Sequence, residues 1–372
     1  MQHDMAFGMG VGTAVPAKAP AVPVIDVRDG GPAEHARQRL EQARVLRAAC
    51  LSLLPATLRA ALPLIDRIAR RSLERSRSPY LAEIARIAEI LEYPGVWLLN
   101  ASYQFACTSL ARDEGGVPWL VRTLDWPFPG LGRHVEVAHM RGPSGDFFNA
   151  TWPGYVGVLT AMAPSRFAAC INQAPLRRRF HHRWLRSYDV ARNAIASMAD
   201  DGRMPPDQLL RLAFESCDDF AAARRMLEST AVARPVIFTL AGCAAGERCV
   251  IERTETGFVT REHDTGAAND WFPDRPGWES RIGIRRFLTS TYDEAKGYSC
   301  SRREALAAWR GALDDRSFAW VCEPVLNPYT RLAAALCPAR GILRVVGYEE
   351  VGPDLPVPVT QVCDVEAAVQ FA

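Results

Sequence analysis

The segment QFACTSLARDEGGVPWLVRTLDW, Gln104–Trp126, contains two apparent strands joined at Gly115-Gly116, and it is the most informative part of the chain. Cys107 stands at the start of the first strand, and Arg122 and Asp125 lie on the second. In a two-stranded hairpin these three side chains can meet near one end of a sheet. A guanidinium beside a thiol favours the reactive thiolate. The segment therefore predicts a sheet edge that carries a cysteine nucleophile.

The base that would activate this thiol is not obvious. None of the seven histidines forms a local motif with Cys107. If the peptide bond between Ala106 and Cys107 is cut, the new α-amino group can act as the base, because its pKa of about 7.7–8.0 lies close to neutral pH. N-terminal nucleophiles of this kind are known. Two alternatives stay open, namely a buried cysteine without a catalytic role and an uncleaved thiol hydrolase that uses His134 or His139.

Composition excludes several classes of protein. Hydrophobic residues make up 48% and charged residues 23% of the 372 residues, and the net charge is +2, so a broad nucleic-acid-binding surface is not expected. No apolar run approaches the roughly 20 residues of a membrane helix, and the start of the chain lacks the pattern of a signal peptide. We expect a cytoplasmic protein with reduced cysteines. No metal site and no cofactor motif is recognised.

The order of predicted elements indicates an α+β fold. Residues 1–22 are expected to be a disordered tail, and helices are expected over about 33–53, over 63–76 and behind the Ser78-Pro79 cap. Strands are predicted at 105–112, 119–125, 134–141, 147–152, 157–162 and 167–172. Helices follow at 187–200, 205–216 and 218–229, and then come hairpins that turn at 254–257 and 338–341. Strands clustered apart from helices favour antiparallel sheets covered by helices.

Extended to FACTSLARDEGGVPWLVRTLDWPF, the segment resembles the nucleophile region of acid ceramidase and N-acylethanolamine acid amidase. These are N-terminal nucleophile hydrolases, a superfamily that includes choloylglycine hydrolase and penicillin V acylase. The resemblance continues through FFNATWPGYVGVLTAMAPSRFAACINQAP, FAAARRMLESTAVARPVIFTLAGCAAGERCVIERT, AANDWF and the last hairpin. It covers about 270 of the 372 residues, from about Trp97 onward.

The resemblance implies a four-layer αββα sandwich made as a precursor that cuts itself between Ala106 and Cys107. Residues 23–106 would then form a helical N-terminal segment, the alpha chain, and residues 107–372 the catalytic core, the beta chain. The residues that match catalytic positions are Cys107, Arg122, Asp125, Asn172, Asn269 and Arg281. Cys107 matches the nucleophile, Arg122 and Asp125 match its partners, and the two asparagines match the oxyanion-hole positions.

One match to the family is ambiguous, and two departures from the family pattern are visible. Arg281 is the best match for a further active-site arginine, but Arg285 competes with it because the loop length there is uncertain. Gln173 follows Asn172 where the relatives carry Glu, which removes a charge. The spacing from Cys107 to the matching arginine is one residue shorter than in the relatives, and a tighter turn at 113–116 would absorb the difference.

Two further features are candidates for substrate contact. Aromatic residues in turns near the matched positions could line an acyl pocket or pack in the core, and they are Trp126, Phe128, Trp152, Tyr155 and Trp271. The basic stretch Leu176–Arg186 is either a solvated loop or a rim that meets anionic head groups at a membrane or lipid surface.

We therefore expect a self-processing cysteine amidase that hydrolyses linear amides of apolar, lipid-like acyl groups through an acyl-thioester on Cys107. Its partner would be a small-molecule N-acyl amide, without nucleic acid, and the alpha and beta chains would stay associated. An acyltransferase that uses the same thioester is one alternative. A non-catalytic binding protein on the same fold is another.

Overall fold

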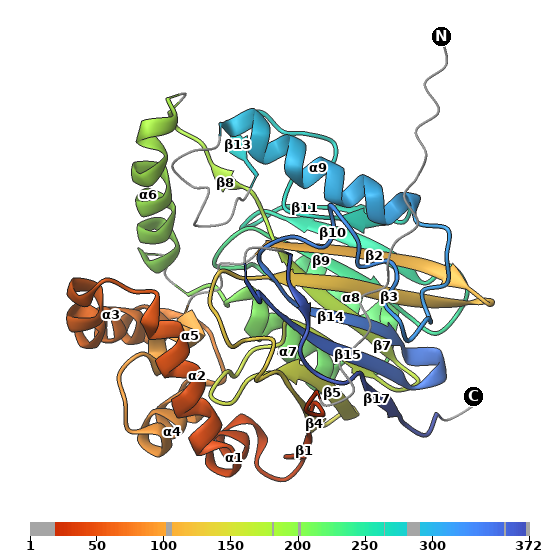
Figure 1. Ribbon diagram of the computed structural model, residues 1–372, viewed down its shortest axis with the longest axis horizontal. Helices are drawn as coiled ribbons and strands as arrows, with labels where there is room; N and C mark the ends of the chain where they lie inside the picture. Colours follow the sequence, from red (N-terminus) through yellow and green to blue (C-terminus); the bar gives the residue numbers. More distant parts are fainter. Residues whose placement is uncertain are drawn as a thin grey trace.

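The computed structural model describes residues 19–101, 106–180, 182–199, 202–263, 265–280, 291–352 and 355–369. In it, the hairpin of β2 (Ala106–Glu114) and β3 (Val117–Asp125) runs from the middle of the molecule to its margin (Figure 1). Gly115 and Gly116 have φ angles of 60° and 82°, as a two-residue hairpin turn of this kind requires. The turn fixes the register, so Cys107 lies opposite Leu124 and Ser109 lies opposite Arg122.

Two large sheets contain most of the strands. The seven-stranded sheet has the order β12-β2-β3-β14-β15-β16, with β17 also paired to β15. Its other strands are β12 (Gly266–Ala267), β14 (Thr330–Cys337), β15 (Ile342–Glu349), β16 (Val357–Pro358) and β17 (Cys363–Glu366). The hairpin predicted at 338–341 is therefore confirmed as β14–β15.

The eight-stranded sheet has the order β1-β4-β5-β6-β7-β9-β10-β11. Its strands are β1 (Val24–Asp26), β4 (Glu136–Gly142), β5 (Gly145–Thr151), β6 (Thr160–Ala163), β7 (Phe167–Gln173), β9 (Val236–Ala241), β10 (Arg248–Arg253) and β11 (Phe258–Arg261). Of the six strands predicted over 105–172, the first two are β2 and β3 of the other sheet, and the run from β4 to β7 is an antiparallel meander. A separate two-stranded sheet joins β8 (Leu176–Arg177) to β13 (Trp278–Glu279).

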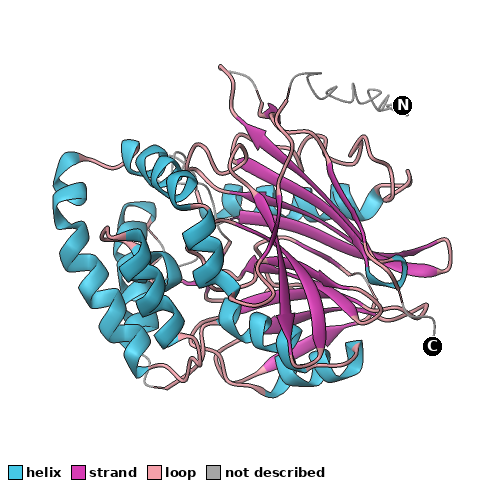
Figure 2. Cartoon of the chain, turned by 90° about the horizontal axis from the view of Figure 1, so that it is seen from below, coloured by secondary structure: helices cyan, strands magenta, loops and turns pink. Residues whose placement is uncertain are grey.

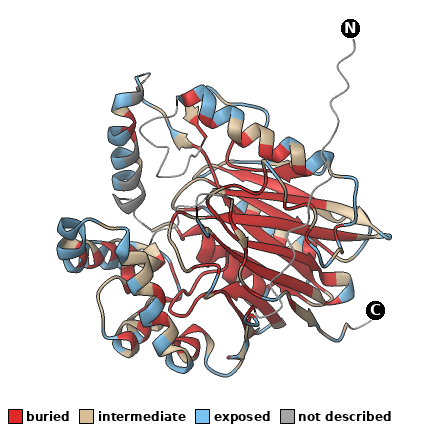
Figure 3. Cartoon of the chain, viewed as in Figure 1, coloured by how far each residue is buried: buried red, intermediate tan, exposed pale blue. Residues whose placement is uncertain are grey.

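The layers follow the αββα order. Helices α7 (Pro206–Ser216) and α8 (Phe220–Ser229) pack on the eight-stranded sheet, and α9 (Tyr292–Ala308) packs on β2 and β12 of the other. The two sheets face each other, with β2 and β3 against β7 and β9 (Figure 2). Most strand residues in this sandwich are buried (Figure 3). The two facing sheets with helices on their outer faces confirm the predicted four-layer architecture.

The N-terminal segment packs beside the sandwich. Its helices are α1 (Gly31–Gln38), α2 (Leu40–Ser52), α3 (Ala56–Arg75), α4 (Leu81–Leu91) and α5 (Val96–Ala101). The segment is not purely helical, because β1 pairs in parallel with β4 at the edge of the eight-stranded sheet. α6 (Arg186–Ala199) belongs to the part of the chain after residue 106, and it contacts α3 of the N-terminal segment.

Two helix predictions were wrong. α3 begins at Ala56, not at residue 63, and Pro63 lies inside it. Its buried residues, among them Leu62 and Asp66, pack toward α5, and Asp66 accepts a hydrogen bond from the Leu98 N–H at 2.8 Å. Such tertiary contacts outweigh the backbone bond that proline removes. α9 was missed altogether, because its buried face carries Ser299, Arg302 and Arg303, so no apolar stripe marks it.

Candidate active site

Cys107 and Arg122 contact each other on the face of the β2–β3 hairpin that points toward the other sheet. They are diagonal neighbours across the hairpin, and Arg122 Nη2 donates to Cys107 Sγ at 2.8 Å. The same guanidinium donates to Thr160 Oγ1 at 2.6 Å and to the Ile171 carbonyl at 3.1 Å. Because Thr160 and Ile171 belong to the facing sheet, packing of the two sheets fixes where the cation lies.

Burial opposes ionisation of this thiol. Cys107 is fully buried, and loss of hydration raises the pKa of its thiol to about 12, although the Arg122 charge acts in the opposite direction. Arg122 favours the thiolate, as expected, but desolvation is the larger effect, so the thiol still depends on a base to lose its proton during turnover.

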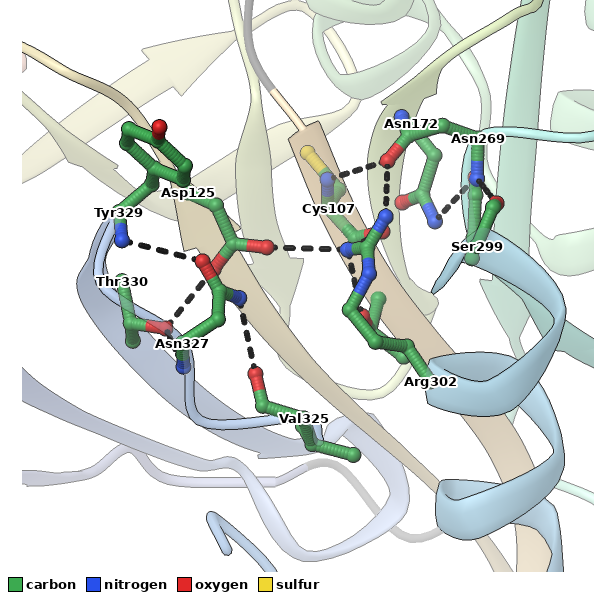
Figure 4. A network of polar contacts seen from close by, with 12 residues as sticks. Cys107, Asp125, Asn172, Asn269, Ser299, Arg302, Val325, Asn327, Tyr329 and Thr330 are labelled. Atoms are coloured by element: carbon green, nitrogen blue, oxygen red, sulfur yellow. Dashed lines mark hydrogen bonds and ion pairs between the residues drawn. The ribbon is translucent and has the colours of Figure 1, made fainter. Parts of the chain in front are cut away.

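The backbone of Cys107 is held by a second group of residues (Figure 4). Its N–H donates to Asn269 Oδ1 at 2.9 Å, and its carbonyl accepts from Arg302 Nη1 at 2.9 Å. Arg302 also donates to Thr108 Oγ1 at 3.0 Å, to Asp125 Oδ2 at 3.0 Å and to Asn269 Oδ1 at 2.9 Å. One buried guanidinium therefore joins the cysteine backbone to a carboxylate and to an asparagine.

The side chains of Asp125 and Arg122 project from opposite faces of the hairpin, and hydrogen bonds fix Asp125 in place. Its Oδ1 accepts from Thr330 Oγ1 at 3.0 Å, and Thr330 Oγ1 in turn accepts from the Asn327 N–H at 3.1 Å. Burial raises the pKa of the Asp125 carboxyl, and the adjacent Arg302 charge is the strongest influence in the other direction. Arg302 is thus the cation that favours an ionised Asp125 in this site.

Asn269 is oriented by the hydrogen bonds at its oxygen. Because Cys107 N–H and Arg302 both donate to Oδ1, the amide nitrogen points the other way, and it donates to the Gln173 carbonyl at 2.8 Å. Nδ2 carries a second hydrogen for a further acceptor. The Asn172 side chain is used differently, since its nitrogen donates to the Ala267 and Ala268 carbonyls at 3.2 Å each.

Sequence reasoning chose another arginine for this site. Arg281 and its competitor Arg285 lie outside the described residues. The arginine that the structure places beside Asp125 is Arg302, on α9. A signal for that helix was present, because Thr291 and Glu294 form a capping box, which marks a helix start without any apolar stripe.

Four of the five predicted substrate-contact aromatics meet at one cavity, with a volume of about 210 Å³. Trp126, Phe128, Trp152 and Tyr155 line it from the core, and leucines of the N-terminal segment, among them Leu62, line it from the other side. Trp126 directly follows Asp125 in the chain, and Trp126 and Trp152 make an edge-to-face contact.

Trp271 does not share this cavity. It lines a polar cavity of about 160 Å³, where its ring contacts the Trp278 ring edge-to-face. The Arg275 guanidinium lies over the Trp271 ring, 4.7 Å from the ring centre. Trp271 thus lies at a different cavity from the other four aromatics, and its contact with substrate stays a prediction. The loop after Asn269 turns its ring toward β13, away from the N-terminal segment.

The histidines proposed as an alternative base are used elsewhere. His139 hydrogen-bonds Asp146 at 3.0 Å and stacks on Phe148. Burial lowers the pKa of both His134 and His139. In the part of the chain that the structure describes, no histidine hydrogen-bonds Cys107, and no cluster of three metal-ligating side chains occurs. Within the same ranges, no helix has the length and apolar character needed to cross a bilayer.

Comparison with known proteins adds the following. No protein-family model matches the chain. The N-acylethanolamine-hydrolyzing acid amidase of Cavia porcellus is 29% identical over 186 residues, covering 48% of this chain and 49% of that protein. A probable acid ceramidase of Caenorhabditis elegans is 27% identical over 219 residues, covering 52% of each. The chain thus spans about half the length of the curated relatives that it matches.

Two solved structures are also similar. The Caenorhabditis elegans orthologue of N-acylethanolamine-hydrolyzing acid amidase has a TM-score of 0.42 at 14% identity, covering 63% of this chain and 93% of that one. A conjugated bile acid hydrolase from Clostridium perfringens has a TM-score of 0.33 at 10% identity, covering 72% of this chain and 99% of that one.

Proposed function

Because the chain is related to acid ceramidase and N-acylethanolamine-hydrolyzing acid amidase, within the N-terminal nucleophile hydrolases, we propose that it is a self-processing cysteine amidase. The observation that carries the proposal is the surroundings of Cys107. Its sulfur contacts a guanidinium, and its nitrogen contacts an asparagine amide that Arg302 orients. Intact-mass analysis of wild-type and Cys107→Ala protein tests it.

Processing begins within β2. The Cys107 thiol adds to the Ala106 carbonyl, the thiol proton passes to the Cys107 nitrogen, and the peptide C–N bond breaks to leave a free α-amine. The product is a thioester between Ala106 and Cys107 Sγ, which water hydrolyses to an Ala106 carboxylate and a free thiol. Ala106 is paired with Asp125 across the hairpin, so the bond to be cut is held at a fixed place beside the site.

Turnover then uses the new amine as the base. It takes the thiol proton, and the thiolate adds to the amide carbonyl of the substrate. The oxyanion accepts a hydrogen bond from Asn269 Nδ2, and one such donor lowers the barrier by about 2.7–4 kcal/mol. The α-ammonium protonates the leaving amine, and water hydrolyses the acyl-thioester. Arg122 stabilises the thiolate, while Arg302 and Asp125 hold the terminus in place.

The N-terminal segment stays bound after cleavage in this proposal. β1 remains paired with β4, and His35 Nε2 lies 2.6 Å from Glu136 Oε2 in a fully buried contact. Tyr80 donates to Glu215 on α7 at 2.7 Å. Every one of these contacts joins residues before position 106 to residues after it, so cutting one peptide bond leaves them intact.

The apolar cavity is the proposed site for the acyl group. Two residues that line the cavity are next in sequence to residues of the site. Trp126 follows Asp125, and Leu159 precedes Thr160, which accepts a hydrogen bond from Arg122. The cavity is lined mainly by apolar side chains, as expected for a lipid-like acyl chain.

Replacing Leu62 with phenylalanine tests that assignment. Leu62 is 6% exposed and lines the cavity, so the larger ring would occupy space needed by a long acyl chain. We expect kcat/KM for soluble long-chain N-acyl amides to fall about 10-fold, with short-chain amides unaffected. Leu58→Phe is the matched control, because Leu58 is on the same helix but 47% exposed and does not line the cavity. Equal losses for short and long chains would contradict the assignment.

We also propose contact with a lipid surface through apolar side chains near α6 and α3. Trp184 is 71% exposed, Ile195 is 57% exposed and Leu64 is 58% exposed, and the two helices contact each other. The basic residues nearby are less suited to this role. Arg177 already pairs with Glu255 at 2.6 Å, and Arg186 pairs with Glu279.

Vesicle co-sedimentation distinguishes these contributions. Trp184→Ala should reduce binding several-fold on both neutral and anionic vesicles, because it removes an interfacial aromatic. Arg177→Ala should change binding little. Phe258→Ala is the control, since Phe258 is an exposed aromatic on β11, away from α6. Binding that depends only on anionic lipid and on Arg177 would refute the apolar contact.

A further inference from the structure

Asn269 is held at its backbone as well as at its side chain. Its backbone N–H donates to Ser299 Oγ at 2.9 Å, and Ser299 Oγ lies 2.7 Å from Asp270 Oδ1. A serine hydroxyl has one proton. Since the Ser299 oxygen accepts a hydrogen bond from the Asn269 N–H, the Ser299 hydroxyl donates its own hydrogen bond to the Asp270 carboxylate. The donor-to-acceptor direction of these two hydrogen bonds is therefore defined, from the Asn269 amide through the Ser299 hydroxyl to Asp270.

All three residues are removed from water. Asn269 and Ser299 are fully buried, and Asp270 is 5% exposed. Ser299 lies three residues before Arg302 on α9, so both side chains project from one face of the helix. Arg302 binds the Asn269 side-chain oxygen while Ser299 binds its backbone nitrogen. One helix face therefore holds this asparagine at two points.

We propose that Ser299 and Asp270 are positioning residues that set where the Asn269 amide donor lies. This rests on the proposed function, in which Asn269 Nδ2 meets the oxyanion. Asp270 acts through Ser299 by accepting a hydrogen bond from its hydroxyl, which leaves the hydroxyl oxygen oriented to accept from the Asn269 backbone. Small displacements of a preorganised donor lower turnover without weakening substrate binding, because the oxyanion forms only after binding.

The test compares Ser299→Ala with Ser301→Ala. Ser301 is two residues further along α9, and its hydroxyl donates to the Tyr298 carbonyl of its own helix, so the same chemical change there leaves Asn269 untouched. We expect Ser299→Ala to lower kcat about 10-fold per titrated active site with KM unchanged. Ser301→Ala should keep the wild-type kcat.

Asp270→Asn provides the conservative variant. Its side-chain oxygen can still accept the Ser299 proton, so we expect activity closer to wild type than that of Ser299→Ala or Asp270→Ala. A purely structural role would reduce the number of active sites or the melting temperature but not kcat per site. An unchanged kcat in Ser299→Ala, or an equal loss in Ser301→Ala, would overturn the positioning role.

Hydrogen exchange gives a readout that needs no substrate. Loss of the Ser299 hydroxyl should speed exchange of the Asn269 amide at least 10-fold, and Ser301→Ala should not change it. The two proposals fail separately. Wild-type protein that hydrolyses no amide contradicts the amidase function, whereas an Asn269 amide that exchanges at the same rate in Ser299→Ala contradicts the positioning role.

Discussion

Cys107→Ala protein should remain one uncleaved chain and hydrolyse no amide, whereas wild-type protein should separate under denaturing conditions into residues 1–106 and 107–372. The reason is that, in the proposed mechanism, a single sulfur carries out both reactions. It forms the thioester with Ala106 during processing and the thioester with substrate during turnover. Intact-mass analysis with a parallel amide-hydrolysis assay measures both effects, and loss of the nucleophile should lower the rate by a factor of at least about 1,000.

The matched control is Cys243→Ala. Cys243 is a partly buried cysteine in the turn after β9, and its thiol lies 3.6 Å from the Arg166 carbonyl. This variant should process and turn over as wild type does. Under native conditions the two wild-type pieces should elute together in gel filtration, because β1, His35 and Tyr80 still join them. A wild-type chain that is active while uncleaved would refute the use of an N-terminal amine as the base.

Arg302→Met should reduce both stability and turnover. The side chains have similar length, but methionine cannot donate to the Cys107 carbonyl, Thr108, Asp125 or Asn269. Breaking a buried ion pair from one side costs about 3–5 kcal/mol. Turnover should fall at least about 100-fold, since Asn269 loses the donor that orients its amide. Thermal melting and steady-state kinetics measure the two effects.

The destabilisation should depend on pH in a defined direction. Without Arg302, burial would raise the pKa of Asp125 further above its unfolded value of about 3.9. A carboxyl with a raised pKa in the folded state is stabilising while protonated, and that contribution is lost as the pH rises through the acidic range. The difference in melting temperature between wild type and Arg302→Met should therefore be larger at neutral pH than near pH 4.

Arg303→Met is the control for that experiment. Arg303 is the next residue of α9 and also largely buried, but its guanidinium lies over the Phe272 ring at 4.0 Å instead of against Asp125. It should show neither the loss of turnover nor the pH-dependent destabilisation. If the Arg302→Met and wild-type melting temperatures ran parallel across pH, Asp125 would not be the group that Arg302 keeps ionised.

The sequence was sufficient to predict the hairpin and much of the sandwich. Gly115-Gly116 fixes a two-residue turn, and counting outward from it places Cys107 and Arg122 as diagonal neighbours. The strands of the meander were predicted because their turns recur at regular spacing. Such features are local, since backbone conformation at a glycine pair and alternation along a strand depend on adjacent residues.

Other features could not be read from the order of residues. Arg302 reaches Asp125 across a separation of 177 residues, and it projects from a helix whose buried face mixes Ser299, Arg302 and Arg303 with apolar residues, so that no continuous apolar stripe marks it. The capping box at Thr291 was a signal for that helix, but it does not indicate what the helix packs against.

The electrostatic state of the thiol also depended on the whole fold. The sequence indicated that Arg122 favours the Cys107 thiolate, and its charge does act in that direction, but burial between two sheets raises the pKa of the thiol by more. The contact between the Arg122 guanidinium and the Cys107 sulfur follows from the register of two adjacent strands, which is set locally by their turn. Hydration of that sulfur depends on every layer that covers it, so it is set only when the sheets and helices have packed together.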